Sequence, residues 1–397
     1  MRRHHAACRI RVLAVPPLLC VALVGAAAPA PAAATAGWAG PAFRPASVNR
    51  GAILYDVAAI SARSAWAVGQ TGSVSSARPA TLIERWRGGA WRRLPSPTGA
   101  TGGSLDAVAA TSADRAWAVG QTGGSATLKP ATLIERWNGA RWRIVPSPTP
   151  AGGGALFGLA ATSARSAWAV GQTGPNFGNK PKTLILRLNG TRWRRVPSPN
   201  AATPGSWLGA VAVASAGSAW AVGCACNGPV LKPLIERWNG TRWRIVPGPN
   251  LGAGGAVLYG VAMASARSVW AVGCNACLKA KPETVILHWN GTAWKRVPSP
   301  NPASGGTLSG VAVTSASNAW AVGWTGVPGM PRPKTLIERW NGIEWKRVPS
   351  PDPAGTAALF GVAAASARSA WAAGATGRLG GTNPSTVALR WNGATWK

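Results

Sequence analysis

The chain has 397 residues and a formal net charge of +32, with 50 glycines, 33 prolines and ten acidic residues. Beyond residue 5 it holds a single histidine, His288, so a multi-histidine metal site and a Ser-His-Asp triad both lack the residues they need. We therefore expect no enzyme activity, no metal and no cofactor.

Residues 1–36 have the pattern of a secretory signal peptide. Arg2 and Arg3 begin a basic region, an apolar stretch follows to about residue 28, and Ala34-Thr35-Ala36 matches a cleavage site. The apolar stretch is too short and too rich in proline to cross a membrane. We expect a secreted, extracellular protein, free or associated with the cell envelope, without membrane insertion.

Residues 37–50 are predicted to form a closing segment. Phe43–Ser47 resembles Leu94-Pro95-Ser96-Pro97, a segment with five later copies, and the chain stops at Lys397 without a seventh. We expect residues 43–47 to pair beside the third or fourth strand of the last repeat. The alternative is a chain shortened at its C-terminus, with residues 37–50 disordered.

Residues 51–397 contain seven copies of a repeat that begins with Trp-Ala-Val-Gly or Trp-Ala-Ala-Gly, at spacings of 51, 51, 52, 50, 50 and 51. A second signature, Leu-Ile-Glu-Arg-Trp-Asn-Gly-x-x-Trp in full form, follows in each unit, and Val-Pro-Ser-Pro or a near-copy of it follows in the first six. Each repeat contains four short strand-like runs, with an Asn-Gly hairpin between the last two. This period predicts an all-β, seven-bladed β-propeller of four-stranded antiparallel blades.

Tryptophan marks the repeat: 20 of 23 occupy three recurring positions, and we expect them to wedge between neighbouring blades or to brace the outer hairpin. The combination of Trp-Ala-Val-Gly with Arg-Trp-Asn-Gly-x-x-Trp resembles Trp-rich repeat proteins exported by actinobacteria, which are uncharacterised and treated as propellers. A weaker likeness to Asp-box and kelch propellers lacks their defining residues, so it implies no activity.

Four cysteines follow the Trp-Ala-Val-Gly motif in adjacent repeats: Cys224, Cys226, Cys274 and Cys277. Three pairings are possible, and export favours disulfides over a four-cysteine zinc site. We expect the two loops to be joined, or at least all four thiols to be oxidised.

Acidic side chains are predicted to be dispersed. The recurring Glu84, Glu135, Glu236 and Glu338 stand beside arginine, and we expect them to form exposed ion pairs on the outer strands. The remaining acidic residues share no repeat position, so the sequence gives little support to a paired-carboxylate site. They are Asp56, Asp106, Asp114, Glu283, Glu344 and Asp352.

Basic residues recur in register, and about +28 of the charge remains once the four arginines of the signal are removed. One position holds Arg85, Arg136, Arg187, Arg237, Arg339 and Arg390, and another holds Arg92, Arg143, Arg194, Arg244, Lys295 and Lys346. This charge is either a solvated surface or a contact for a polyanion: an anionic cell-wall polymer, an acidic polysaccharide, or nucleic acid bound non-specifically.

Three functions are compatible with the sequence. The leading hypothesis is a monomeric, non-catalytic module that binds an anionic surface polymer or a protein partner. The second is a lectin-like propeller that binds carbohydrate through aromatic residues, and the third is a structural or display protein. The candidate aromatic contacts are Trp207, Trp324 and Phe177 in long loops, and the repeat-equivalent Tyr55, Phe157, Tyr259 and Phe360, whose alternative role is packing between blades.

Overall fold

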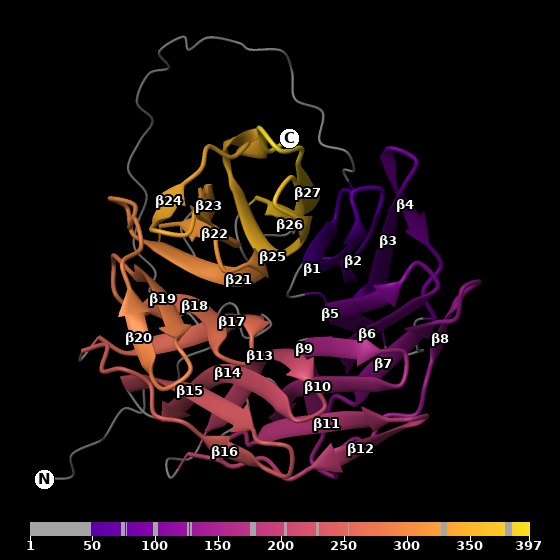
Figure 1. The fold of residues 1–397 in the computed structure, drawn as a ribbon. Coiled ribbons are helices and arrows are strands. Elements are labelled where there is room, and N and C mark those ends of the chain that lie inside the picture. Colours follow the sequence, from indigo (N-terminus) through magenta and orange to yellow (C-terminus); the bar gives the residue numbers. More distant parts are fainter. Residues whose placement is uncertain are drawn as a thin grey trace, which may run out of the picture.

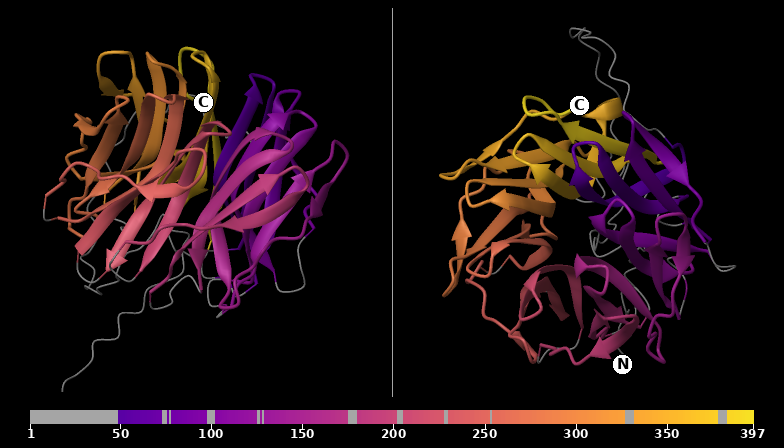
Figure 2. Two further views of the ribbon diagram at one scale, coloured as in Figure 1. Left: turned by 60° about the horizontal axis from the view of Figure 1, so that its bottom comes forward. Right: turned by 45° about the vertical axis from the view of Figure 1, so that its right-hand side comes forward.

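A computed structural model describes residues 49–397 except 73–75, 77, 98–101, 125–126, 128, 175–179, 202–204, 228–229, 253, 327–331 and 378–382. The predicted signal peptide, residues 43–47 and Phe177 lie outside the described part. Within it, seven antiparallel sheets are arranged around a common axis, as predicted for a seven-bladed propeller (Figure 1 and Figure 2). The last blade lies against the first, because strands β25 (Ala357–Ser366) and β26 (Ser369–Thr376) contact β1 (Ala52–Ser61).

Within each blade the strands follow chain order from the axis to the rim. Blades 1 to 3 consist of β1 with β2 (Ser64–Thr71), β3 (Ala80–Arg87) and β4 (Ala90–Leu94); β5 (Gly103–Ser112), β6 (Arg115–Thr122), β7 (Thr132–Trp137) and β8 (Trp142–Ile144); and β9 (Gly154–Ser163), β10 (Ser166–Thr173), β11 (Thr183–Asn189) and β12 (Arg192–Val196).

Blades 4 to 7 repeat this arrangement, and a short 3-10 helix, η2 (Pro353–Gly355), precedes the last blade. Their strands are β13 (Ser206–Ser215), β14 (Ser218–Asn227), β15 (Val230–Trp238) and β16 (Trp243–Ile245); β17 (Ala256–Ser265), β18 (Ser268–Asn275), β19 (Glu283–Trp289) and β20 (Trp294–Val297); β21 (Gly306–Ser315), β22 (Asn318–Thr325), β23 (Thr335–Trp340) and β24 (Trp345–Arg347); and β25 and β26 with β27 (Ser385–Trp391).

The glycine of Trp-Ala-Val-Gly is required by a close backbone approach. A Cβ atom on Gly69 would lie 1.9 Å from the carbonyl oxygen of Ile53, and one on Gly171 would lie 1.9 Å from that of Ala155. Because these contacts are to backbone, no side-chain movement could relieve them. Close to the carbonyl group that this glycine approaches, the first strand contains a bulge. The bulge residue, which is Tyr55 in blade 1 and Phe157 in blade 3, has no partner on the second strand.

Tryptophans from two blades meet at each blade interface, as predicted. Trp66 of blade 1 packs against Trp137 and Trp142 of blade 2, with ring centroids 5.1 Å away in both cases. The same trio closes the ring, where Trp371 of blade 7 contacts Trp86 and Trp91 of blade 1. The same aromatic contact thus joins each blade to the next around the ring.

The recurring glutamates are buried rather than exposed, so the prediction of surface ion pairs is wrong. Glu135, Glu236 and Glu338 have no exposed surface. Each accepts a hydrogen bond from the serine of Val-Pro-Ser-Pro, or of Leu-Pro-Ser-Pro in blade 1, in the preceding blade: Ser96 to Glu135 at 3.1 Å, Ser198 to Glu236 at 3.2 Å and Ser299 to Glu338 at 2.9 Å. Neighbouring residues of a strand point to opposite faces, which separates each glutamate from the arginine that follows it.

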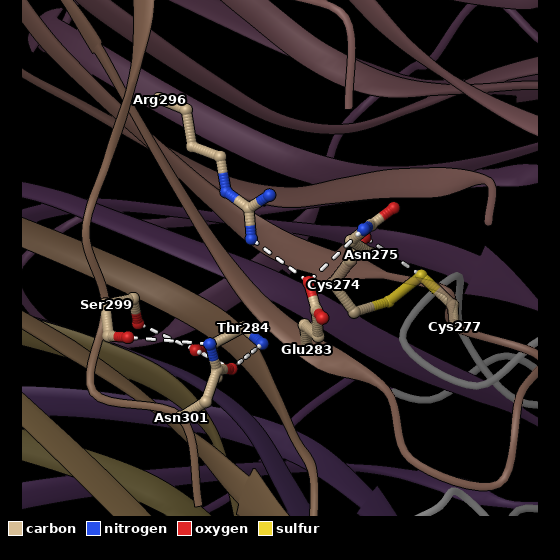
Figure 3. A network of polar contacts seen from close by, with 8 residues as sticks. All are labelled: Cys274, Asn275, Cys277, Glu283, Thr284, Arg296, Ser299 and Asn301. Carbon is tan, nitrogen blue, oxygen red and sulfur yellow. Dashed lines mark hydrogen bonds and ion pairs between the residues drawn. A yellow bond between two sulfur atoms is a disulfide. The ribbon is translucent and has the colours of Figure 1, made fainter. Parts of the chain in front are cut away.

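The same serines also bond within their own blade, where the hydroxyls of Ser96 and Thr81 lie 2.6 Å apart. Figure 3 shows this contact in blade 5, between Ser299 and Thr284. Blade 4 has Pro233 and Gly248 at these two positions and so lacks both hydroxyls. The serine is therefore a link between its own third strand and the glutamate of the next blade.

At the junction of blades 7 and 1 the described N-terminal residues provide this link. The backbone N–H of Asn49 donates to Thr386 Oγ1 of blade 7 at 2.9 Å, and its side-chain Nδ2 donates to Glu84 of blade 1. Arg50 pairs with Ser385 at the start of β27. The contact of residues 43–47 with this blade stays a prediction.

The four cysteines form two disulfides, each within one blade, with Cα atoms 5.5 Å apart in both. Cys224 and Cys226 lie in β14 and not in a loop as we expected, and Cys274, near the end of β18, bonds to Cys277 just beyond that strand. The expectation of a bond between the two blades is wrong, whereas oxidation of all four thiols agrees with the structure. The sulfurs join Trp207, Val257 and Tyr259 in one buried cluster. Each disulfide therefore links residues of a single blade, at the end of its second strand.

Asn49→Ala should lower the melting temperature, because it removes the side-chain donor to Glu84 at the junction that closes the ring. The expected loss is about 0.5–1.5 kcal/mol of unfolding free energy, the net contribution of one hydrogen bond. Thermal denaturation measures it, and Asn189→Ala, at an exposed hairpin, is the control. Equal stability of the two variants would contradict the linking role of Asn49.

Stability should decline as pH rises from about 4.5 to about 8. Burial raises the pKa of Glu135 and Glu236 to about 8 and that of Glu338 to about 7. A folded-state pKa above the unfolded value means that stability is greatest at acidic pH and is lost as the groups ionise. Melting temperatures across this range test the sign.

Replacing all three glutamates by glutamine should make that profile shallower, because the amide oxygen still accepts the serine hydrogen bond and cannot ionise. The slope that remains would come from Asp56 and Asp106, whose pKa values burial also raises, to about 7. Glu344→Gln, on an exposed hairpin, should leave the slope unchanged. A triple variant with the slope of the parent protein would show that other groups set the pH dependence.

Candidate functional site

A cavity of about 230 Å³ lies on the propeller axis and is lined by the first strand of every blade. Its wall consists of the bulge residues and the two that follow each bulge. The bulge position varies between blades and holds Tyr55, Asp106, Phe157, Gly209, Tyr259, Ser309 and Phe360. The position after it is small in six blades and holds Asp56 in the first.

Glycine at this second position lets the inner strands approach one another around the axis. A Cβ atom on Gly158 would lie 2.7 Å from the Cα of Ala210, and one on Gly361 would lie 2.6 Å from Asp56 Oδ1. The carboxyl group of Asp56 thus occupies space beside blade 7. It also reaches blade 2, because the N–H of Val108 donates to its Oδ2 at 2.9 Å.

Asp56 and Asp106 line the same cavity, whereas we expected the acidic side chains to be dispersed. They occupy different repeat positions, one at the bulge and one after it, and the ring geometry brings them to one wall. The N–H of Val57 donates to Asp56 Oδ1 at 2.8 Å, and the hydroxyl of Ser104 donates to Asp106 Oδ2 at 3.1 Å. Burial raises the pKa of each carboxyl group to about 7.

The four repeat-equivalent aromatic residues all lie at the bulge and line the cavity, where each is buried. Tyr55 and Phe360 have ring centroids 6.0 Å apart. Trp207 and Trp324 do not lie in long loops as we expected, because they are buried within β13 and β22. Their rings contact those of Tyr259 and Phe360, at centroid distances of 6.1 and 6.0 Å.

The outer strands carry a second candidate site, made of like charges placed opposite one another. The second, third and fourth strands align Trp66 with Arg85 and Arg85 with Arg92, so the three side chains share one face of blade 1. The tryptophan is buried, the first arginine is half-buried and the second is exposed. Other blades repeat this row with Arg136 and Arg143, Arg187 and Arg194, Arg237 and Arg244, and Arg339 and Lys346.

The inner arginine of four of these five rows stacks on tryptophan from two blades, whereas Arg136 stacks on Trp117 alone. The Arg85 guanidinium carbon lies 4.7 Å from the centroid of Trp66 and 5.6 Å from that of Trp137 in blade 2. Arg390 stacks in the same way on Trp371 and Trp86, and its Nη2 donates to the carbonyl oxygen of Ala62 at 3.1 Å. These arginines are fixed at blade interfaces, whereas the outer ones extend into solvent. Polyanion contact by either set stays a prediction.

His288 takes the place of the inner arginine in blade 5. Its ring lies over Trp270 at a centroid distance of 4.3 Å, and its Nε2 is 3.0 Å from the hydroxyl of Ser268. Burial lowers its pKa. These contacts match the structural role expected from its repeat position.

Few carboxylates neutralise the rim. Among the described residues, side-chain ion pairs join Arg296 to Glu283 at 3.1 Å, visible in Figure 3, and Lys346 to Glu344 at 2.8 Å. The described residues contain no cluster of three or more His, Cys, Asp or Glu side chains placed to hold a metal ion. No helix in the described part is long and apolar enough to cross a membrane.

No family model matches the chain, and no curated protein matches its sequence. Similar solved structures include YCF48 from Cyanidioschyzon merolae, at 15% identity and a TM-score of 0.52, covering 87% of this chain and 98% of the other. YCF48 bound to a D1 peptide matches at 16% identity and 0.51, covering 87% and 96%.

A polysaccharide lyase, ulvan lyase bound to -[GlcA(1-4)Rha3S]-, matches at 10% identity and a TM-score of 0.53, covering 84% of this chain and 90% of the other. At these identities the likeness shows the fold alone: the chain is similar to seven-bladed β-propellers.

Proposed function

We propose that this protein is an exported, non-catalytic β-propeller that binds an anionic surface polymer along its rim. The observation that carries the proposal is the repeated cross-strand pair of cations on the outer strands of five blades. Like charges placed directly opposite one another destabilise a sheet. A polyanion lying over the pair would remove that repulsion at every blade it crosses.

Two further features favour polymer binding at the rim. The recurring glutamates point into the blade interfaces, so they do not neutralise the outer arginines. Stacking on tryptophan holds the inner guanidinium of each pair in place, which reduces the entropy lost when an anion binds. Export follows from the predicted signal peptide, and a polybasic rim would retain the protein at an anionic cell envelope.

The alternatives are less well supported by the described residues. A carbohydrate site on long-loop aromatic residues loses Trp207 and Trp324, which are buried. Propellers similar in fold include proteins bound to a peptide and to an anionic sugar repeat, so the fold itself is compatible with either partner.

Binding of heparin, teichoic-acid-type polymer and DNA should be multivalent and should fall steeply with salt. For DNA, the binding constant falls by factors of about 10³–10⁵ between 50 and 200 mM salt when 6–10 phosphates are contacted. Titration of the mature protein at several salt concentrations measures this slope. Failure of all three polymers to bind at about 50 mM salt would leave the charge as a solvated surface only.

A matched pair of variants separates rim geometry from net charge. Replacing Arg92, Arg143, Arg194 and Arg244 by glutamine should weaken binding and reduce the salt slope for DNA by about one unit per lost phosphate contact. The control replaces four exposed lysines that lie outside these rows by glutamine, so it removes the same amount of charge and should have a smaller effect. These are Lys129, Lys182, Lys281 and Lys334. Equal losses would indicate attraction by net charge alone.

A further inference from the structure

The axial cavity has no part in polymer binding at the rim, yet its wall is unlike the rest of the molecule. None of the described residues that line it is basic, although the chain as a whole carries a large positive charge. Two carboxyl groups, Asp56 and Asp106, lie in this wall. They are thus withdrawn from the arginines that dominate the outer surface.

Tyr55 adds a polar group close to this wall. The residue lines the cavity and is 3% exposed, and its hydroxyl is buried with no hydrogen-bond partner among the described residues. A buried hydroxyl without a partner costs free energy. Because the hydroxyl has no accessible surface, a ligand in the cavity would bond it only after the ring turns. Burial and the negative charge of Asp106 both raise the pKa of this phenol, so it stays protonated.

The polar groups of the wall are mainly acceptors. Both oxygens of Asp56 already accept backbone N–H groups, and each can accept a further hydrogen bond. The hydroxyl of Ser309 is committed to the backbone, since it donates to the carbonyl oxygen of Leu359 at 2.7 Å. The lining contains no amide, guanidinium, ammonium or imidazole side chain.

Aromatic rings complete the wall on the other blades, at Phe157, Tyr259 and Phe360. The face of an aromatic ring attracts a cation, and carboxylates beside such rings are the usual surroundings of a bound ammonium group. The cavity volume of about 230 Å³ is below the range of roughly 300–1,000 Å³ typical of drug-sized ligands, so we expect a small ligand.

We propose that the axial cavity binds a small organic ammonium cation, held between the carboxyl groups of Asp56 and Asp106 and the aromatic rings of the bulge position. The cation would provide the positive partner that the two buried carboxyl groups lack in the described structure. The cation would also lie beside Tyr55, which lines the same cavity. This site is distinct from the rim, so polymer binding and cation binding stand or fall separately.

The test uses choline and ethanolamine as probes, with 3,3-dimethylbutan-1-ol as a neutral compound of the same shape as choline. Isothermal titration and thermal shift with the mature protein should detect millimolar or tighter binding of at least one ammonium probe and none of the neutral compound. Asp106→Asn keeps the acceptor for Ser104 and removes the charge, and it should weaken binding by about tenfold or more. Tyr55→Phe should weaken it by a smaller factor.

Glu344→Gln is the matched control, because it removes one carboxylate from an exposed hairpin and should leave binding unchanged. Circular dichroism and melting curves establish that each variant is folded. The proposal is overturned if neither ammonium probe binds, if the neutral compound or a monosaccharide binds as well as choline does, or if folded Asp106→Asn binds as tightly as the parent protein.

Discussion

The structure depends on one contact repeated around the ring, in which a second-strand tryptophan packs against the outer hairpin of the next blade. In six of seven interfaces that hairpin supplies two tryptophans, and between blades 2 and 3 Leu188 stands in for one of them, leaving Trp117 against Trp193. Because the contact joins different blades, every repeat needs its neighbour to bury its largest side chain. Closure of the ring is therefore a condition of stability, which gives the junction at Asn49 its importance.

That contact also separates charge. On one face of the third strand, the inner arginine stacks on the tryptophan rings at the rim. On the opposite face of that strand, the glutamate is buried against the serine of the preceding blade. Cations are thereby concentrated outside, and carboxyl groups are buried between blades and at the axis. A basic composition alone would not produce this separation, because it arises from alternation along the third strand.

The periodic features were predictable from sequence, and the errors have physical causes. Seven blades, the hairpins and the inter-blade tryptophans follow from spacing, since identical units must pack identically. Glu135 was misread because blades are buried on both faces, so adjacency to Arg136 says nothing about exposure. Cys224 and Cys226 were expected to lie in a loop that reaches the next blade, whereas β14 extends over both residues and they bond to each other.

The axial carboxyl groups were missed for a more general reason. Asp56 and Asp106 differ in repeat position, and only the bulge, which the repeat pattern does not reveal, places both on one wall. The bulge position also varies among the seven repeats, from aspartate to serine, glycine and aromatic residues. Because these side chains stand around one axis, their variation makes the cavity wall asymmetric, with carboxyl groups on blades 1 and 2 and rings on blades 1, 3, 5 and 7. A ligand on the axis would therefore meet a different chemical group on each side, although the fold that surrounds it is a ring of similar units.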